Sequence, residues 1–135
     1  MAVRLGAKDV VALAKFYDAA FGLKQIDQVG QPPTEIIMRY GANAAAAKAG
    51  NSPEFLVERR EGSASADSMA HAIFRVSDIA ATVAAAKAAG ATIKTDVASV
   101  PIGNIMVKLA TLTDPDGNVL ELMELPKGTD HLPHP

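Results

Sequence analysis

The stretch Ala2-Val-Arg-Leu-Gly-Ala-Lys-Asp9-Val10 is matched, without a gap, by His71-Ala-Ile-Phe-Arg-Val-Ser-Asp78-Ile79. In both stretches apolar side chains alternate with others, which is the pattern of a half-buried strand, and an aspartate then stands where a helix N-cap is expected. A helix is expected to follow each aspartate. The sequence therefore predicts an internal repeat whose halves each open with a strand and a helix.

The segments after each helix correspond as well. In the first half we expect a strand at 3–7, a helix from 10 to Gly22, strands at 23–29, 35–40 and 54–60, and a loop at 41–52 with room for one helical turn. In the second half we expect a strand at 71–76, a helix from 79 to Gly90, strands at 92–97, 104–112 and 119–125, a break at 100–103 and a turn at 114–118. One half of about 65 residues buries little surface alone, so the two halves should pair through their sheets.

Composition excludes several classes of function. The 135 residues carry 13 Lys+Arg against 15 Asp+Glu, a net charge of −2, so nothing favours binding to nucleic acid. The absence of cysteine excludes disulfides, thiolate metal sites and cysteine nucleophiles. No apolar run approaches the ~20 residues that a membrane span needs. The N-terminal residues lack a signal-peptide pattern, so we expect no membrane partner and a cytoplasmic location.

Three stretches carry a resemblance to a known family: Ala14-Lys-Phe-Tyr-Asp-Ala-Ala-Phe-Gly-Leu23 after Asp9, the strand that opens at His71, and Asp114-Pro-Asp-Gly-Asn-Val-Leu-Glu-Leu122. Their order and spacing resemble the vicinal oxygen chelate superfamily, which includes glyoxalase I, extradiol dioxygenases and bleomycin-resistance proteins. The resemblance implies an α+β fold of two tandem βαβββ modules that pair to enclose a cavity. We expect a single domain at 1–126, with modules at 1–62 and 70–126, and a flexible tail at 127–135.

The resemblance also implies a set of metal ligands on cavity-facing strand positions. His71 stands at the histidine position of the second module, and Glu121 at the glutamate position of its last strand. The corresponding positions of the first module hold Ala2 and Leu56, whose side chains cannot ligate. A shift of two residues along the strand would let Glu58 replace the missing ligand on the same face.

The remaining candidate residues can be interpreted as structural or as functional. Arg4 and Arg75 are expected on the cavity side, where each could hold a substrate carboxylate or form an ion pair within its sheet. Leu56 would line the cavity as an apolar substrate contact. His131 and His134 lie in the tail, where a frayed terminus is the commoner outcome.

These residues support three hypotheses. In the first, the protein is an enzyme of the lyase, isomerase or dioxygenase type that acts on a small oxygenated substrate, with a divalent metal (Zn, Ni, Mn or Fe) on His71, Glu121 and a third group such as Glu58. In the second, it binds a small molecule without any metal, as bleomycin-binding relatives do. In the third, His71 and Glu121 act as catalytic acid and base without a metal. A homodimer is expected in each case.

Overall fold

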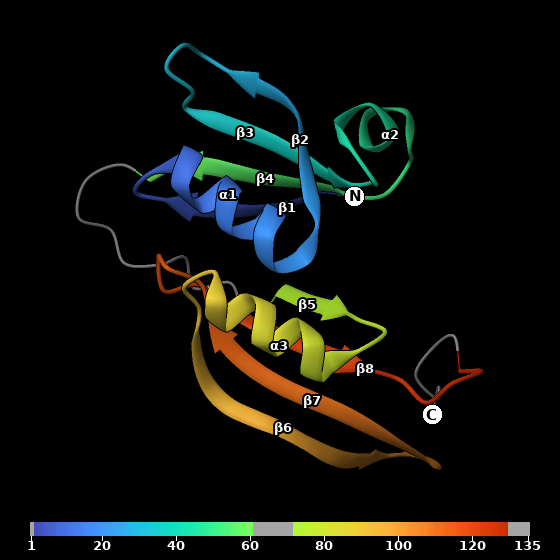
Figure 1. Cartoon of the computed structure of the whole chain (residues 1–135). Coiled ribbons are helices and arrows are strands. Elements are labelled where there is room, and N and C mark those ends of the chain that lie inside the picture. Colours follow the sequence, from blue (N-terminus) through green and yellow to red (C-terminus); the bar gives the residue numbers. More distant parts are fainter. Residues whose placement is uncertain (1, 61–71, 130–135) are drawn as a thin grey trace.

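The computed structural model describes residues 2–60 and 72–129 and is shown in Figure 1. The elements are β1 (Ala2–Ala7), α1 (Val10–Phe21), β2 (Leu23–Val29), β3 (Glu35–Tyr40), α2 (Ala44–Ala49), β4 (Glu54–Arg59), β5 (Ala72–Arg75), α3 (Ile79–Ala88), β6 (Thr92–Ile102), β7 (Ile105–Thr113) and β8 (Val119–Glu124). No helix in these two ranges is long and apolar enough to cross a membrane.

The internal repeat is confirmed by the topology of two four-stranded sheets. The first sheet has the strand order β1-β4-β3-β2, and the second has the equivalent order β5-β8-β7-β6. In each sheet the opening strand pairs in parallel with the last strand of its module, and the other pairs are antiparallel. We refer to residues 2–60 as the first module and residues 72–124 as the second. The predicted α+β fold of two βαβββ modules is therefore correct.

Local signals in the sequence explain both long helices. The carboxylate Oδ1 of Asp9 accepts a hydrogen bond from the Ala12 amide (3.0 Å), and that of Asp78 accepts one from Ala81 (2.9 Å). Each aspartate thereby satisfies an amide that has no partner within its helix. Helix α1 ends at Gly22, whose φ of 73° is the left-handed conformation that glycine adopts without strain.

Two expectations about the strands and loops need correction. The segment 41–52 contains a complete short helix, α2, which Asn43 caps by accepting a hydrogen bond from the Ala46 amide (2.9 Å). The expected break at 100–103 is wrong, because β6 continues through Pro101 to Ile102. Strand β6 is the outer strand of its sheet, so the missing N–H of proline costs no ladder hydrogen bond inside the sheet.

The core lies between the helices and the sheets. The predicted helix-facing residues of the second module are buried, with Phe74 7% exposed and Leu120 and Leu122 fully covered. In the first module Phe55 and Val57 are buried in the same way. Figure 1 shows α1 and α3 side by side in front of the two sheets, and the two helices are in contact. Neither α1 nor α3 covers the opposite surface of its sheet, and we call that surface the open face.

Candidate functional site

The open face of the first module carries an ion-paired arginine. Strand register places Arg4 beside Leu56 and Glu35 beside Glu58. The Arg4 Nε lies 3.2 Å from the Glu58 carboxylate, and its Nη2 lies 3.8 Å from that of Glu35. Leu56 is half-buried between these charges and Ile37, its neighbour on β3. The carboxylate proposed as a replacement metal ligand is therefore in contact with an arginine.

The open face of the second module centres on Glu121. This residue lies on β8, between Ile73 on β5 and Thr111 on β7. Its side chain is half-buried, and no hydrogen bond or ion pair to its carboxylate occurs within residues 2–60 and 72–129. Ile73 beside it is 59% exposed. The result is a carboxylate next to an exposed apolar side chain, on a face without a helix.

The remaining predicted site residues are placed as follows. Arg75 lies beside Met123, and its Nη2 donates a hydrogen bond to the Thr129 carbonyl (2.7 Å). Ala2 lies in β1, opposite Glu54 in the parallel register. His71, His131 and His134 lie outside the described residues.

A metal centre of the usual kind does not fit the donors that are described. No group of three or more His, Cys, Asp or Glu suited to a metal ion occurs in the part of the chain that the structure covers. Ala2 and Leu56 supply only hydrocarbon at two ligand positions. Glu121 is the one family-position donor that the described residues retain.

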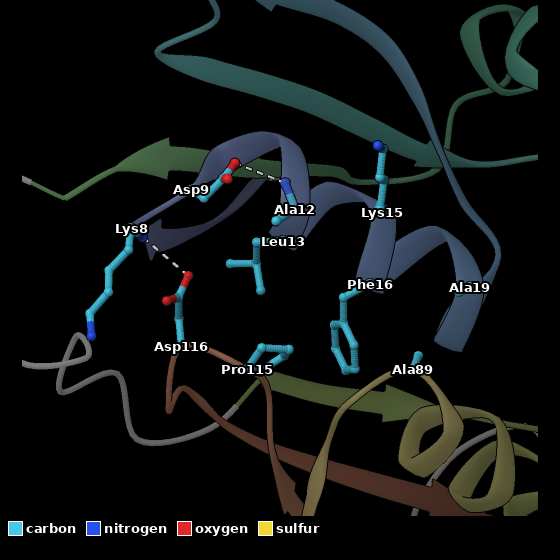
Figure 2. Close-up of a pocket in the computed structure, with 10 residues that line it drawn as sticks. All are labelled: Lys8, Asp9, Ala12, Leu13, Lys15, Phe16, Ala19, Ala89, Pro115 and Asp116. Carbon is cyan, nitrogen blue, oxygen red and sulfur yellow. Dashed lines mark hydrogen bonds between the residues drawn. The ribbon is translucent and has the colours of Figure 1, made fainter.

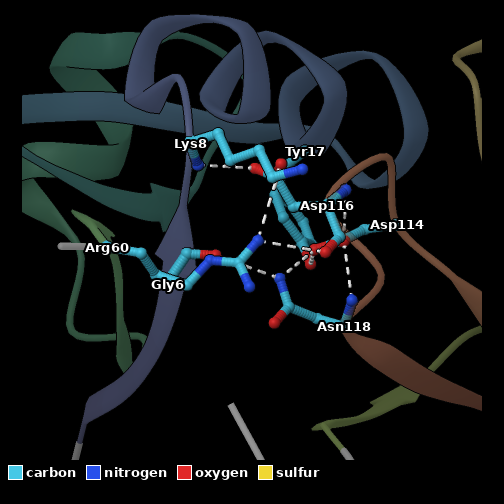
Figure 3. A network of polar contacts seen from close by, with 7 residues as sticks. All are labelled: Gly6, Lys8, Tyr17, Arg60, Asp114, Asp116 and Asn118. Atoms are coloured by element: carbon cyan, nitrogen blue, oxygen red, sulfur yellow. Dashed lines mark hydrogen bonds and ion pairs between the residues drawn. The ribbon is translucent and has the colours of Figure 1, made fainter. Parts of the chain in front are cut away.

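Sequence reasoning missed a buried polar network that joins the two modules. Tyr17 donates its hydroxyl hydrogen to Asp114 Oδ2 (2.8 Å), and the Asn118 side-chain amide donates to the same oxygen (2.7 Å) and to the Gly6 carbonyl (3.3 Å). The other oxygen of Asp114 accepts from the backbone amides of Asp116 and Asn118, at 2.9 Å each. Figure 3 shows these groups converging on the Asp114 carboxylate.

The network extends to the surface through Asp116. Its carboxylate accepts a hydrogen bond from the Lys8 amide (3.1 Å), and its backbone carbonyl accepts one from Arg60 Nη2 (3.1 Å). Burial, followed by the adjacent Asp114 carboxylate, raises the pKa of Tyr17 well above its ordinary value. Tyr17 therefore stays protonated and acts as a hydrogen-bond donor throughout the physiological pH range.

One signal could have revealed this network. Tyr17 occupies a buried position in the apolar stripe of α1, and a buried tyrosine hydroxyl needs a hydrogen-bond partner. The sequence predicts only a turn at 114–118. Its two aspartates and one asparagine are more polar groups than a tight turn requires, but the sequence does not show that Asp114 and Asn118 are buried.

Aromatic rings make another contact between the modules. The ring of Phe74 on β5 stacks on Phe21 of α1, with centroids 4.5 Å apart and an interplanar angle of 10°. It also lies 5.7 Å from Phe55 on β4 and 6.3 Å from Tyr17. The polar network and this ring cluster together fix how the two open faces sit relative to one another.

A groove of about 400 Å³ runs between α1 and the turn before β8. Figure 2 shows Leu13, Phe16 and Pro115 directed into it. Its carboxylates already have partners, because Asp9 caps α1 and Asp116 accepts the Lys8 amide. The groove therefore marks the junction of the modules, and both of its carboxylates are already engaged.

Comparisons with known proteins agree with this architecture. The structure is similar to a glyoxalase/bleomycin resistance protein/dioxygenase family enzyme from Burkholderia phytofirmans PsJN, with 19% identity, a TM-score of 0.65 and coverage of 92% of this chain and 96% of that one. It is also similar to TioX from Micromonospora sp. ML1, with 17% identity, a TM-score of 0.66 and coverage of 93% and 98%.

A glyoxalase I mutant from Zea mays is similar too, with 22% identity and a TM-score of 0.68 over 90% of this chain but only 44% of the maize protein. At these identities the likeness shows the fold alone. No curated protein matches the sequence. Residues 2–122 match the family described as the Glyoxalase/Bleomycin resistance protein/Dioxygenase superfamily, to which this chain therefore belongs.

Proposed function

We propose that this chain binds a small molecule on the open face of its second module, with Glu121 as the main hydrogen-bond acceptor and without a metal held by three or four protein ligands. The observation that carries the proposal is the Glu121 carboxylate, which is half-buried and has no partner among the described residues. Hydrogen bonds from a ligand would stabilise a half-buried carboxylate that has no other partner.

The donor set supports binding without a metal. Two of the four family ligand positions hold Ala2 and Leu56, residue types that cannot ligate a metal. Glu58 would have to leave Arg4, 3.2 Å away, before it could serve a cation. Each missing donor lowers metal affinity, while an apolar surface with few polar groups is typical of sites for organic ligands.

The neighbours of Glu121 indicate the kind of ligand. An ionised carboxylate is an acceptor only, so the ligand must present O–H or N–H donors. The exposed Ile73 beside it offers contact to an apolar body. A molecule with adjacent hydroxyl groups on a small ring meets both requirements, and catechol is a simple probe of this class.

Titration of catechol into ¹⁵N-labelled protein tests the proposal. We expect saturable shifts of the Ile73, Thr111 and Glu121 amides, and an affinity about tenfold lower in Glu121→Gln, because a hydrogen bond to a charged group is lost. Glu58→Gln is the matched control, since it removes a carboxylate on the other open face that Arg4 already pairs. Equal affinity in the wild type and Glu121→Gln would refute the proposal.

The same carboxylate favours a second candidate, the metal-assisted lyase, isomerase or dioxygenase-type enzyme. Its metal would be held by Glu121 and by His71, which directly precedes β5. A divalent metal there would stabilise negative charge on substrate oxygens. An enzyme without a metal would instead use these two residues as catalytic acid and base. The homodimer and the cytoplasmic location stay predictions.

A further inference from the structure

Glu121 has a neighbour with a hydroxyl group on the same face of the sheet. Thr111 on β7 lies directly opposite Glu121 on β8 in the antiparallel register. The residues on either side of Thr111, Ala110 and Leu112, belong to the core and are 1% and 0% exposed, so strand alternation directs Thr111 to the open face. Directly opposed residues have Cβ atoms about 4.5–5.5 Å apart, so a hydroxyl and a carboxylate lie side by side on this face.

The Thr111 hydroxyl has no hydrogen-bond partner within residues 2–60 and 72–129. The residue is half-buried, and only its backbone amide is engaged, by donating to Thr95 Oγ1 (3.1 Å). A hydroxyl donates one hydrogen bond and also accepts, whereas an ionised carboxylate only accepts. Thr111 therefore adds a donor beside the acceptor Glu121.

The internal repeat shows that the fold does not require polar residues at these two positions. The equivalent register pair in the first module is Ile37 on β3 with Leu56 on β4. Both side chains are half-buried, as Thr111 and Glu121 are. Two apolar residues thus serve the same place in one sheet, and the hydroxyl and carboxylate distinguish the surface of the second module from that of the first.

Apolar surface continues from this pair along the same face. Leu109, two residues before Thr111 on β7, is half-buried. Its register partner on β8, Met123, is 8% exposed. An apolar surface beside two polar groups fixes the orientation of a small ring that carries oxygen atoms along one edge.

We infer that Thr111 is a specificity-determining residue of the open-face site. Its hydroxyl donates to a ligand oxygen next to the hydroxyl that Glu121 accepts, and the ring of the ligand lies over Leu109. The inference rests on the function proposed above and adds a selectivity to it. A ring with two adjacent hydroxyl groups is preferred to a ring with one.

Titration of catechol and of phenol, which lacks the second hydroxyl, tests this selectivity in ¹⁵N-labelled wild type and Thr111→Val. Valine has nearly the shape of threonine and suits a strand equally well. We expect the variant to bind catechol about fivefold more weakly, because one neutral hydrogen bond is lost, and to bind phenol as the wild type does. The preference for catechol over phenol falls by the same factor, which a general loss of structure would not produce.

Thr113→Val is the matched control, because Thr113 is also half-buried on β7 but lies opposite Val119 instead of Glu121. Both affinities should stay unchanged in this variant, and Glu121→Gln is titrated beside it. If Glu121→Gln weakens catechol binding while Thr111→Val keeps the wild-type preference, or Thr113→Val lowers that preference equally, this inference alone is overturned. If Glu121→Gln binds catechol as the wild type does, or catechol does not bind at all, the proposed function is wrong and this inference with it.

Discussion

Asp114→Ala is expected to lower the free energy of unfolding by about 3–5 kcal/mol, a large effect for a single polar substitution. The substitution removes the acceptor for the Tyr17 hydroxyl, the Asn118 amide and two backbone amides at once. Tyr17 is fully buried and Asn118 is 2% exposed, so water cannot replace the lost hydrogen bonds without opening the junction. Urea unfolding followed by circular dichroism measures the effect.

Two further variants define the origin of that effect. Asp96→Ala removes an exposed aspartate whose carboxylate accepts a hydrogen bond from the next amide, and it should change the stability by no more than about 0.5 kcal/mol. A double-mutant cycle of Tyr17→Phe with Asp114→Ala should give a coupling energy of about 1.5–3 kcal/mol. A loss below about 1 kcal/mol in Asp114→Ala would show that the network does not hold the modules together.

Phe74→Ala is expected to cost about 3–5 kcal/mol, which is typical of a buried phenylalanine. The ring is 7% exposed and contacts Phe21, Phe55 and Tyr17 of the other module. Its removal leaves a cavity between the modules rather than within one of them. The loss should therefore appear as a lower urea midpoint for the whole chain in a single transition.

Ile73→Ala is the matched control for Phe74→Ala. Ile73 is the adjacent residue on the same strand, but it points to the opposite face and is 59% exposed. Its truncation should change the stability by about 0.5 kcal/mol or less. If the two variants had equal stabilities, the ring cluster could not be a main contact between the modules.

Much of the fold can be predicted from local signals in the sequence. Asp9 and Asp78 stand at the same place in the two repeats, and both cap helices. The alternation in the opening strands correctly separates Phe74 from its exposed neighbours. Such signals act over a few residues, so they can be identified without knowledge of the rest of the chain.

Features that depend on distant contacts could not be predicted in the same way. Pro101 ends a strand in most contexts, and only the outer position of β6 explains why the strand continues. Tyr17 and Asp114 are 97 residues apart in the chain, and their hydrogen bond depends on the packing of one module on the other. The sequence allows an ion pair of Arg4 within its sheet, but its partner Glu58 follows only from the register of β1 with β4.

The metal content of the purified protein tests the proposed function most directly. Untagged wild type, His71→Ala and Glu121→Ala would be loaded with Zn²⁺, Ni²⁺, Mn²⁺ or Fe²⁺, dialysed against a weak chelator and analysed for metal. We expect far less than one metal ion per chain in all three proteins, because two donors hold a metal more weakly than the usual three or four. Near-stoichiometric metal in the wild type that disappears in both variants would contradict metal-free binding and establish a metal site on His71 and Glu121.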